Sequence, residues 1–114
     1  MPAVTMPTLT QPASSTEPIQ LLVNATKNGA SYNPTGDPVY IAVLLNGTPQ
    51  PAPGSSAWNT AVWETDPGPQ YWASLLLGPL NSGLTLLPGL YIAYLKITDN
   101  PAVPIRAGAY VLIT

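Results

Sequence analysis

Short apolar runs alternate with turn-forming residues along this chain, and proline or glycine bounds nearly every run. In residues 19–26 (IQLLVNAT), every second residue from Ile19 to Ala25 is apolar, which is the pattern of a half-buried strand. Residues 39–45 (VYIAVLL) are apolar on both faces, which predicts a central strand covered on two sides. Each run has the length of a strand and is too short for a typical helix.

Similar runs follow, and we predict strands at residues 57–65, 70–77, around 84–86, 90–98 and 105–114. The last two flank a Pro-rich turn and are expected to pair as a hairpin. Trp58 and Trp63 are five positions apart, on opposite faces of an uninterrupted strand, so one of them is in the core or a bulge intervenes. Seven short strands separated by turn residues predict an all-β fold, a β-sandwich without helices.

The first 18 residues differ from the rest of the chain. They are rich in proline and threonine, and their apolar residues are scattered without a strand or helix period. We therefore expect residues 1–18 to form an extended N-terminal arm outside the core, and residues 19–114 to form the sandwich domain.

Composition indicates a folded domain with a neutral surface. The chain has 114 residues, of which 46% are hydrophobic and only 7% are charged, against about 25% charged residues in ordinary soluble domains. The apolar content supplies a core in spite of 15 prolines. A neutral surface protects poorly against association, so we expect a subunit packed in an assembly. The alternative is a secreted or simply charge-poor domain.

Charge and residue types also exclude several functions. Three basic residues and a net charge of −2 give no basis for binding nucleic acid or an anionic membrane. Histidine and cysteine are absent, so most nucleophilic, proton-transfer and metal chemistry has no side chain to use. Glu64 and Asp66 form a carboxylate pair, but they precede a Pro-Gly-Pro turn and are expected to be structural. We predict no catalytic, cofactor or metal residues and no enzymatic activity.

Targeting signals are not visible in the sequence. Prolines interrupt the N-terminal region where a secretory signal would need an apolar stretch, and no apolar run has the length of a membrane span.

The aromatic residues are candidates for contact with a partner. The chain has three tryptophans and six tyrosines but no phenylalanine, so the core is expected to use most of them. Aromatic side chains left on the surface of a sandwich anchor protein interfaces or stack on sugar rings. Trp58 follows a loop of Pro, Gly and Ser residues and is the best candidate for an exposed aromatic residue.

A short motif, Leu86-x-Pro88-Gly89-x-Tyr91-x-Ala93, resembles the entry to the sixth strand of immunoglobulin-like and fibronectin-like sandwiches. The resemblance implies an immunoglobulin-like β-sandwich of about seven strands with a tyrosine corner, in which the Tyr91 hydroxyl binds the backbone of the preceding loop. The inter-sheet disulfide of antibody domains is absent, so an antibody-type domain is not implied.

Residues 37–114 resemble small proteins encoded among the head and tail structural genes of tailed phages of actinobacteria. The segments that carry the resemblance are DPVYIAVLLNG, AWNTAVWETD, YWASLLLGP and LPGLYIAYLKITDNPAVPIRAGAYVLIT. Relatives are often more charged around the last hairpin, where Asn100 and Ala102 are neutral in this chain. The resemblance implies a structural role and supplies no catalytic residues.

Together these observations predict a non-enzymatic phage virion protein that is assembled in the host cytoplasm. We expect a capsid decoration or minor capsid protein that binds the major capsid protein or a connector ring, with self-association also open. The predicted partner contacts are Val4, Met6, Leu9 and Trp58. The alternatives are a head–tail connector or tail accessory subunit, and a carbohydrate-binding adhesion module.

Overall fold

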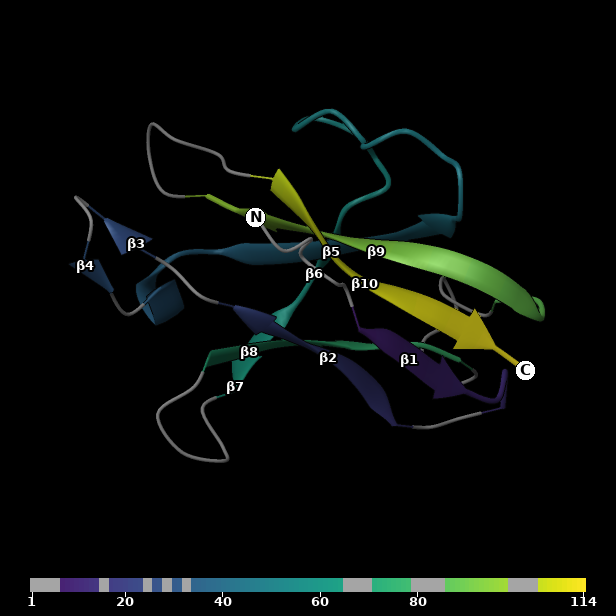
Figure 1. Cartoon of the computed structure of the whole chain (residues 1–114). Helices are drawn as coiled ribbons and strands as arrows, with labels where there is room; N and C mark the ends of the chain where they lie inside the picture. Colours follow the sequence, from purple (N-terminus) through teal and green to yellow (C-terminus); the bar gives the residue numbers. More distant parts are fainter. Residues whose placement is uncertain are drawn as a thin grey trace, which may run out of the picture.

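Two β-sheets pack face to face in the computed structural model (Figure 1). The structure describes residues 7–14, 17–23, 26–27, 30–31, 34–64, 71–78, 86–98 and 105–114. The larger sheet has the order β1-β10-β9-β5-β6, with β1 Thr8–Gln11, β5 Val39–Leu45, β6 Asn59–Thr60, β9 Gly89–Ile97 and β10 Ile105–Ile113. The smaller sheet has the order β2-β8-β7, with β2 Pro18–Val23, β7 Val62–Glu64 and β8 Tyr71–Leu76. The remaining elements are a pair of two-residue strands, β3 Thr26–Lys27 and β4 Ala30–Ser31, and a 3-10 turn, η1 Pro34–Gly36.

The strand connections are those of an immunoglobulin-like sandwich, as predicted. In chain order, β2, β7 and β8 take the places of strands B, D and E, and β5, β9 and β10 take those of C, F and G. Strand β9 pairs antiparallel with both β5 and β10, so it lies at the centre of the larger sheet. The expected hairpin of the last two segments is therefore confirmed.

The core lies between the two sheets. Successive residues of each strand face opposite sides of its sheet, and the side chains that face the other sheet form the core. In β2, β5 and β9 the members of the core cluster are all odd-numbered, as the sequence period required, and Leu45 at the end of β5 departs from it, at 60% exposed. Ile41, Leu77 and Val111 are the largest fully buried side chains. The sheets approach closely at Gly108, where an added Cβ would lie 3.0 Å from Leu21 Cδ1.

The segment 57–65, predicted as one strand, is two strands in different sheets. Asn59–Thr60 pairs with β5, whereas Val62–Glu64 pairs with β8, and the buried Ala61 lies at the crossing point. Figure 1 shows the chain passing from one layer to the other here. The interruption lets Trp63 turn inward against the core, where its indole N–H donates to Asp37 O at 2.8 Å.

The prediction that residues 1–18 stay outside the core is wrong for Thr8–Gln11. These residues form β1, which pairs parallel with β10, and Leu9 packs against the core. The pairing continues on both sides, because Tyr110 N donates to Pro7 O and Ala13 N donates to Thr114 O. The free edge of β10 offered unpaired backbone groups, and pairing them outweighs the weak strand signal of a Pro- and Thr-rich segment.

The predicted tyrosine corner is present at the start of β9. The Tyr91 hydroxyl donates to Leu87 O at 2.8 Å while its ring is buried in the core. Gly89, two residues before Tyr91, has φ +156°, a backbone conformation that other residues rarely adopt. Two other expectations, the strand around 84–86 and the turn at 99–104, fall largely or wholly outside the described residues.

We predict that Tyr91→Phe lowers the free energy of unfolding by about 1 kcal/mol, because the Leu87 carbonyl loses its partner while the ring stays packed. Urea denaturation measures the change. Tyr110→Phe is the matched control, because the tyrosine at 110 is half-buried and no hydrogen bond of its hydroxyl is seen within the described residues. Equal stability of the two variants would show that the corner hydrogen bond contributes nothing.

A second prediction concerns β1. Leu9→Asp should destabilise the fold by about 2 kcal/mol, because it places a charge against the core. Thr10→Asp, on the exposed side of the same strand, should change stability by less than about 0.5 kcal/mol. Thermal unfolding of both variants tests the difference, and a Leu9→Asp variant as stable as the parent would mean that β1 is not held on the domain.

Candidate interaction surface

The outer face of the larger sheet carries a group of apolar side chains, which we call the apolar face: Leu44, Leu90, Ile92, Tyr110 and Leu112. Strand pairing brings them together, because Leu112 lies opposite Leu90 and Ile92 lies between Tyr110 and Leu44. Leu90 and Leu112 are 38% and 36% exposed, and the other three are half-buried. These residues come from three neighbouring strands and form one continuous surface.

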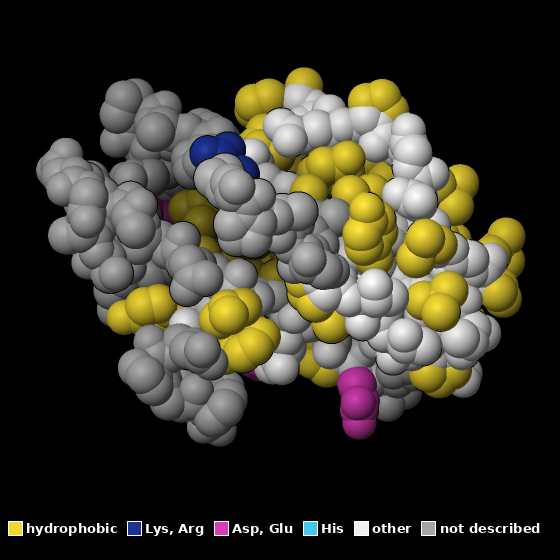
Figure 2. All heavy atoms as spheres, viewed as in Figure 1, with side chains coloured by type: hydrophobic (Ala, Val, Ile, Leu, Met, Phe, Trp, Pro, Cys, Tyr) yellow, Lys and Arg dark blue, Asp and Glu magenta, His cyan; other side chains and the backbone are white. Residues whose placement is uncertain are grey.

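The apolar face arises because β5, β9 and β10 are apolar on both sides. Their inward residues fill the core, so the apolar residues on the other side have no partner within their own sandwich unless a loop covers them. The 79%-exposed Leu87 lies at the same end of the sheet, three residues before Leu90. In Figure 2, hydrophobic side chains stand among neutral ones around the end of the molecule where β10 finishes. A surface of this kind marks a site of protein association.

The border of the apolar face is neutral. Thr8 and Thr10 of β1 lie opposite Tyr110 and Leu112, and both threonines are exposed. Among the described residues of these strands, the nearest charge on the outer face is Lys96, which lies two positions beyond Tyr94 on β9. A partner would therefore be recognised by shape and apolar contact.

A loop covers the other part of the same sheet. Residues 46–58 fold back over β5 and β9, and the Tyr94 hydroxyl donates to Thr48 O at 3.1 Å. Pro51 of the loop and Ala42 of β5 are both buried. The loop thus sets one boundary of the apolar face.

Lys96 fastens the loop to the sheet. Its ammonium Nζ donates to Pro53 O at 2.8 Å and lies 4.4 Å from the centre of the Tyr40 ring and 5.0 Å from that of Trp58. The Trp58 indole N–H in turn donates to Ala52 O at 2.8 Å. This cation–π cluster gives the loop a fixed shape.

The predicted partner contacts fall in different places. Trp58 is half-buried in the loop cluster, and Leu9 faces its own core. Val4 and Met6 lie outside the described residues. A role for any of them in binding a partner stays a prediction. The residues of the apolar face are not among the predicted contacts, although the two-sided apolar pattern of residues 39–45 was a signal for it.

The tryptophans do not share one sheet face. Trp58 lies in the loop over the larger sheet, Trp63 packs against the core, and Trp72 faces outward on β8 between Leu22 and Glu64. Carbohydrate-binding platforms use coplanar aromatic rings, so this arrangement does not favour that alternative.

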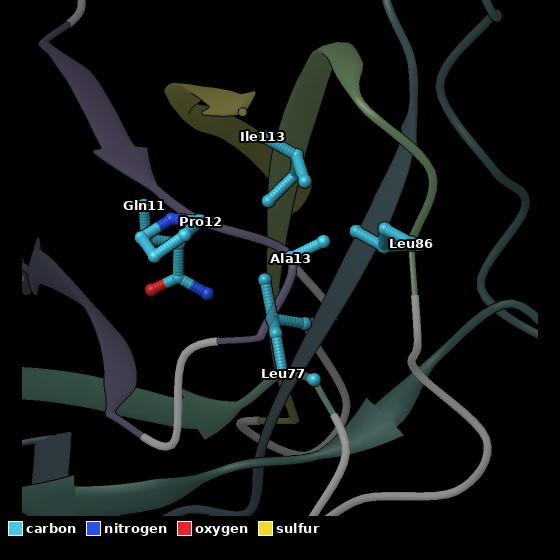
Figure 3. A pocket seen from close by; sticks show the side chains of 7 residues that line it. Gln11, Pro12, Ala13, Leu77, Leu86 and Ile113 are labelled. Atoms are coloured by element: carbon cyan, nitrogen blue, oxygen red, sulfur yellow. The ribbon is translucent and has the colours of Figure 1, made fainter.

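Figure 3 shows a hollow between the ends of β1 and β10, lined among others by Ala13, Leu77, Leu86 and Ile113. Gln11 and Pro12 also line the hollow, which leaves no space for even one water molecule. The hollow is a junction where β1 closes the sandwich and has no room for a ligand.

Acidic groups do not gather in the described part of the chain. Glu64 accepts a hydrogen bond from the Gln20 amide, and Asp66 lies outside the described residues. No three His, Cys, Asp or Glu residues among those described are placed to hold a metal ion. Within the same residues, no helix is long and apolar enough to cross a membrane.

No family model, curated protein or solved structure matches the chain.

We predict that Lys96→Met loosens the loop, because it removes the hydrogen bond to Pro53 and the contact with both rings. The Ser55 amide, which donates to Ala52 O within the loop, should exchange its hydrogen about fivefold faster or more, as expected for a lost contact of about 1 kcal/mol. Hydrogen exchange measures this rate, and the Val111 amide in the core should be unchanged. Unaltered Ser55 exchange would refute the role given to Lys96.

Proposed function

We propose that this protein is a non-enzymatic structural subunit of a phage virion, and that it binds another virion protein through the apolar face. The observation that carries the proposal is the continuous row of exposed and half-buried apolar residues across β10, β9 and β5. The phage setting comes from the sequence resemblance of residues 37–114. A capsid decoration or minor capsid protein, assembled in the host cytoplasm, fits a small neutral sandwich of this kind best.

The energetics of the apolar face suit a stable contact. Each Å² of apolar surface removed from water contributes about 25 cal/mol, so covering several partly exposed leucines supplies a few kcal/mol. The threonine border has no charges that would need to be desolvated. A flat capsid surface that offers apolar side chains would complement it.

The N-terminal segment lies beside the apolar face. Tyr110, a member of the apolar face, donates its backbone N–H to Pro7 O, so the chain enters β1 directly beside this face. We propose that Val4 and Met6 bind the same partner that covers the apolar face. Leu9 then acts by holding β1 in place on the core.

A head–tail connector or tail accessory subunit remains the alternative, since it would use the same surface. The number of copies per particle separates the two roles. Tens to hundreds of copies support decoration, whereas a single ring supports a connector. A particle that contains no copies overturns both.

We predict that Leu90→Lys and Leu112→Lys each weaken binding to the particle by about tenfold or more, because a charge must be desolvated within the contact. Cosedimentation of purified protein with particles that lack it measures the affinity. Val62→Lys is the matched control, since Val62 is 64% exposed on the other sheet. If the control and the two test variants bind alike, the apolar face is not the binding surface.

A further inference from the structure

The two sheets have four edge strands in the described part of the chain, and three of them are poorly suited to pairing with another strand. Strand β1 has four residues between Pro7 and Pro12. Strand β6 has only two residues, and β7 has three, one of which is the charged Glu64. Short length, proline and charge are the means by which proteins prevent edge-to-edge association.

Strand β2 is different. It has six residues (PIQLLV) without a charge, and its one proline stands at the first position. All six residues pair in unbroken register with β8, so no bulge twists the edge away. In the described residues, β2 pairs on this side only. The opposite edge therefore presents an unbroken row of backbone donors and acceptors without a charged side chain.

We propose that β2 pairs antiparallel with β2 of a second copy of this chain across a two-fold axis. The pairing would join two three-stranded sheets into one sheet of order β7-β8-β2-β2-β8-β7. Because each copy uses the same edge, the assembly closes as a dimer. Strand β2 belongs to the smaller sheet, whereas the apolar face belongs to the larger sheet, so the dimer does not depend on the proposed function.

The period of the strand limits the register. Directly opposed residues of an antiparallel pair face the same side, so the axis must pass through a residue, either Gln20 or Leu21 near the strand centre. Either choice keeps Ile19, Leu21 and Val23 of both copies on the core side. The hydrophobic interior thus stays continuous across the new strand pair.

Charge and exposed surface favour a second copy as the occupant. The chain has a net charge of only −2, so two copies repel weakly. Glu17, just before β2, would lie about 20–26 Å from its counterpart, because the strands run in opposite directions. On the outer face, Leu22 is 42% exposed and lies beside the half-buried Trp72 on β8. Pairing would cover both side chains with those of the second copy.

Engineered thiols test the register directly, because the chain has no cysteine of its own. An axis through Gln20 predicts that Gln20→Cys forms a disulfide-linked dimer under mild oxidation. An axis through Leu21 predicts that a mixture of Gln20→Cys and Leu22→Cys forms a mixed dimer, since these two positions then lie opposite each other. In one of the two experiments, linkage should be about tenfold faster or more than for Thr60→Cys, on the edge strand β6. If neither exceeds this control, the proposal is wrong.

Self-association in solution gives a second test. Leu22→Lys places two like charges beside the new strand pair and should raise the dimer dissociation constant about tenfold or more, measured by sedimentation of the full chain. Leu112→Lys, on the other sheet, should leave it unchanged. A monomeric parent chain at high concentration would overturn the proposal. Particle binding keeps the proposed function separate, because it should fail with Leu112→Lys whether or not the dimer forms.

Discussion

The structure depends on burial of one face of each sheet against the other. Apart from Tyr91, the inward residues of β2, β5, β9 and β10 are aliphatic or small, and Ile41, Leu77 and Val111 are fully covered. With no phenylalanine available, the interior is filled mainly by branched aliphatic side chains that pack closely. At Gly108 the approach of the sheets leaves no space for a Cβ without displacing Leu21. Strand pairing, loop positions and exposed surfaces all follow from this contact.

The aromatic residues at the edge of the core show how polar groups are accommodated there. Trp63 and Tyr91 place their rings against the core and direct the N–H or O–H to a backbone carbonyl, of Asp37 and Leu87 respectively. A ring buried without such a partner would lose the hydrogen bond that its polar group makes in water. These two bonds also tie loops to the sandwich, so aromatic packing and loop position are fixed together.

The low number of charged residues has a different consequence for each sheet. On the larger sheet it leaves the apolar face exposed. A loop bounds this face on one side, and Lys96 holds the loop through Pro53 and through the rings of Tyr40 and Trp58. On the smaller sheet it leaves β2 as a neutral edge. We propose that the apolar face binds another virion protein through its side chains, and that β2 pairs two copies of the chain through backbone groups.

The sequence by itself determined the strands with a clear two-residue period, the all-β sandwich and the tyrosine corner, because these depend on local alternation and on short motifs. It did not determine the place of β1, since the pairing partner, β10, is about 100 residues away in the chain and the segment has no strand period of its own. The split at Ala61 and the inward turn of Trp63 also required the tertiary structure, because only the positions of both sheets decide which one a short segment joins. For the same reason the sequence pointed to Trp58 as an exposed aromatic residue and did not reveal the apolar face. That face forms only because β5 lies beside the β9–β10 hairpin in the sheet.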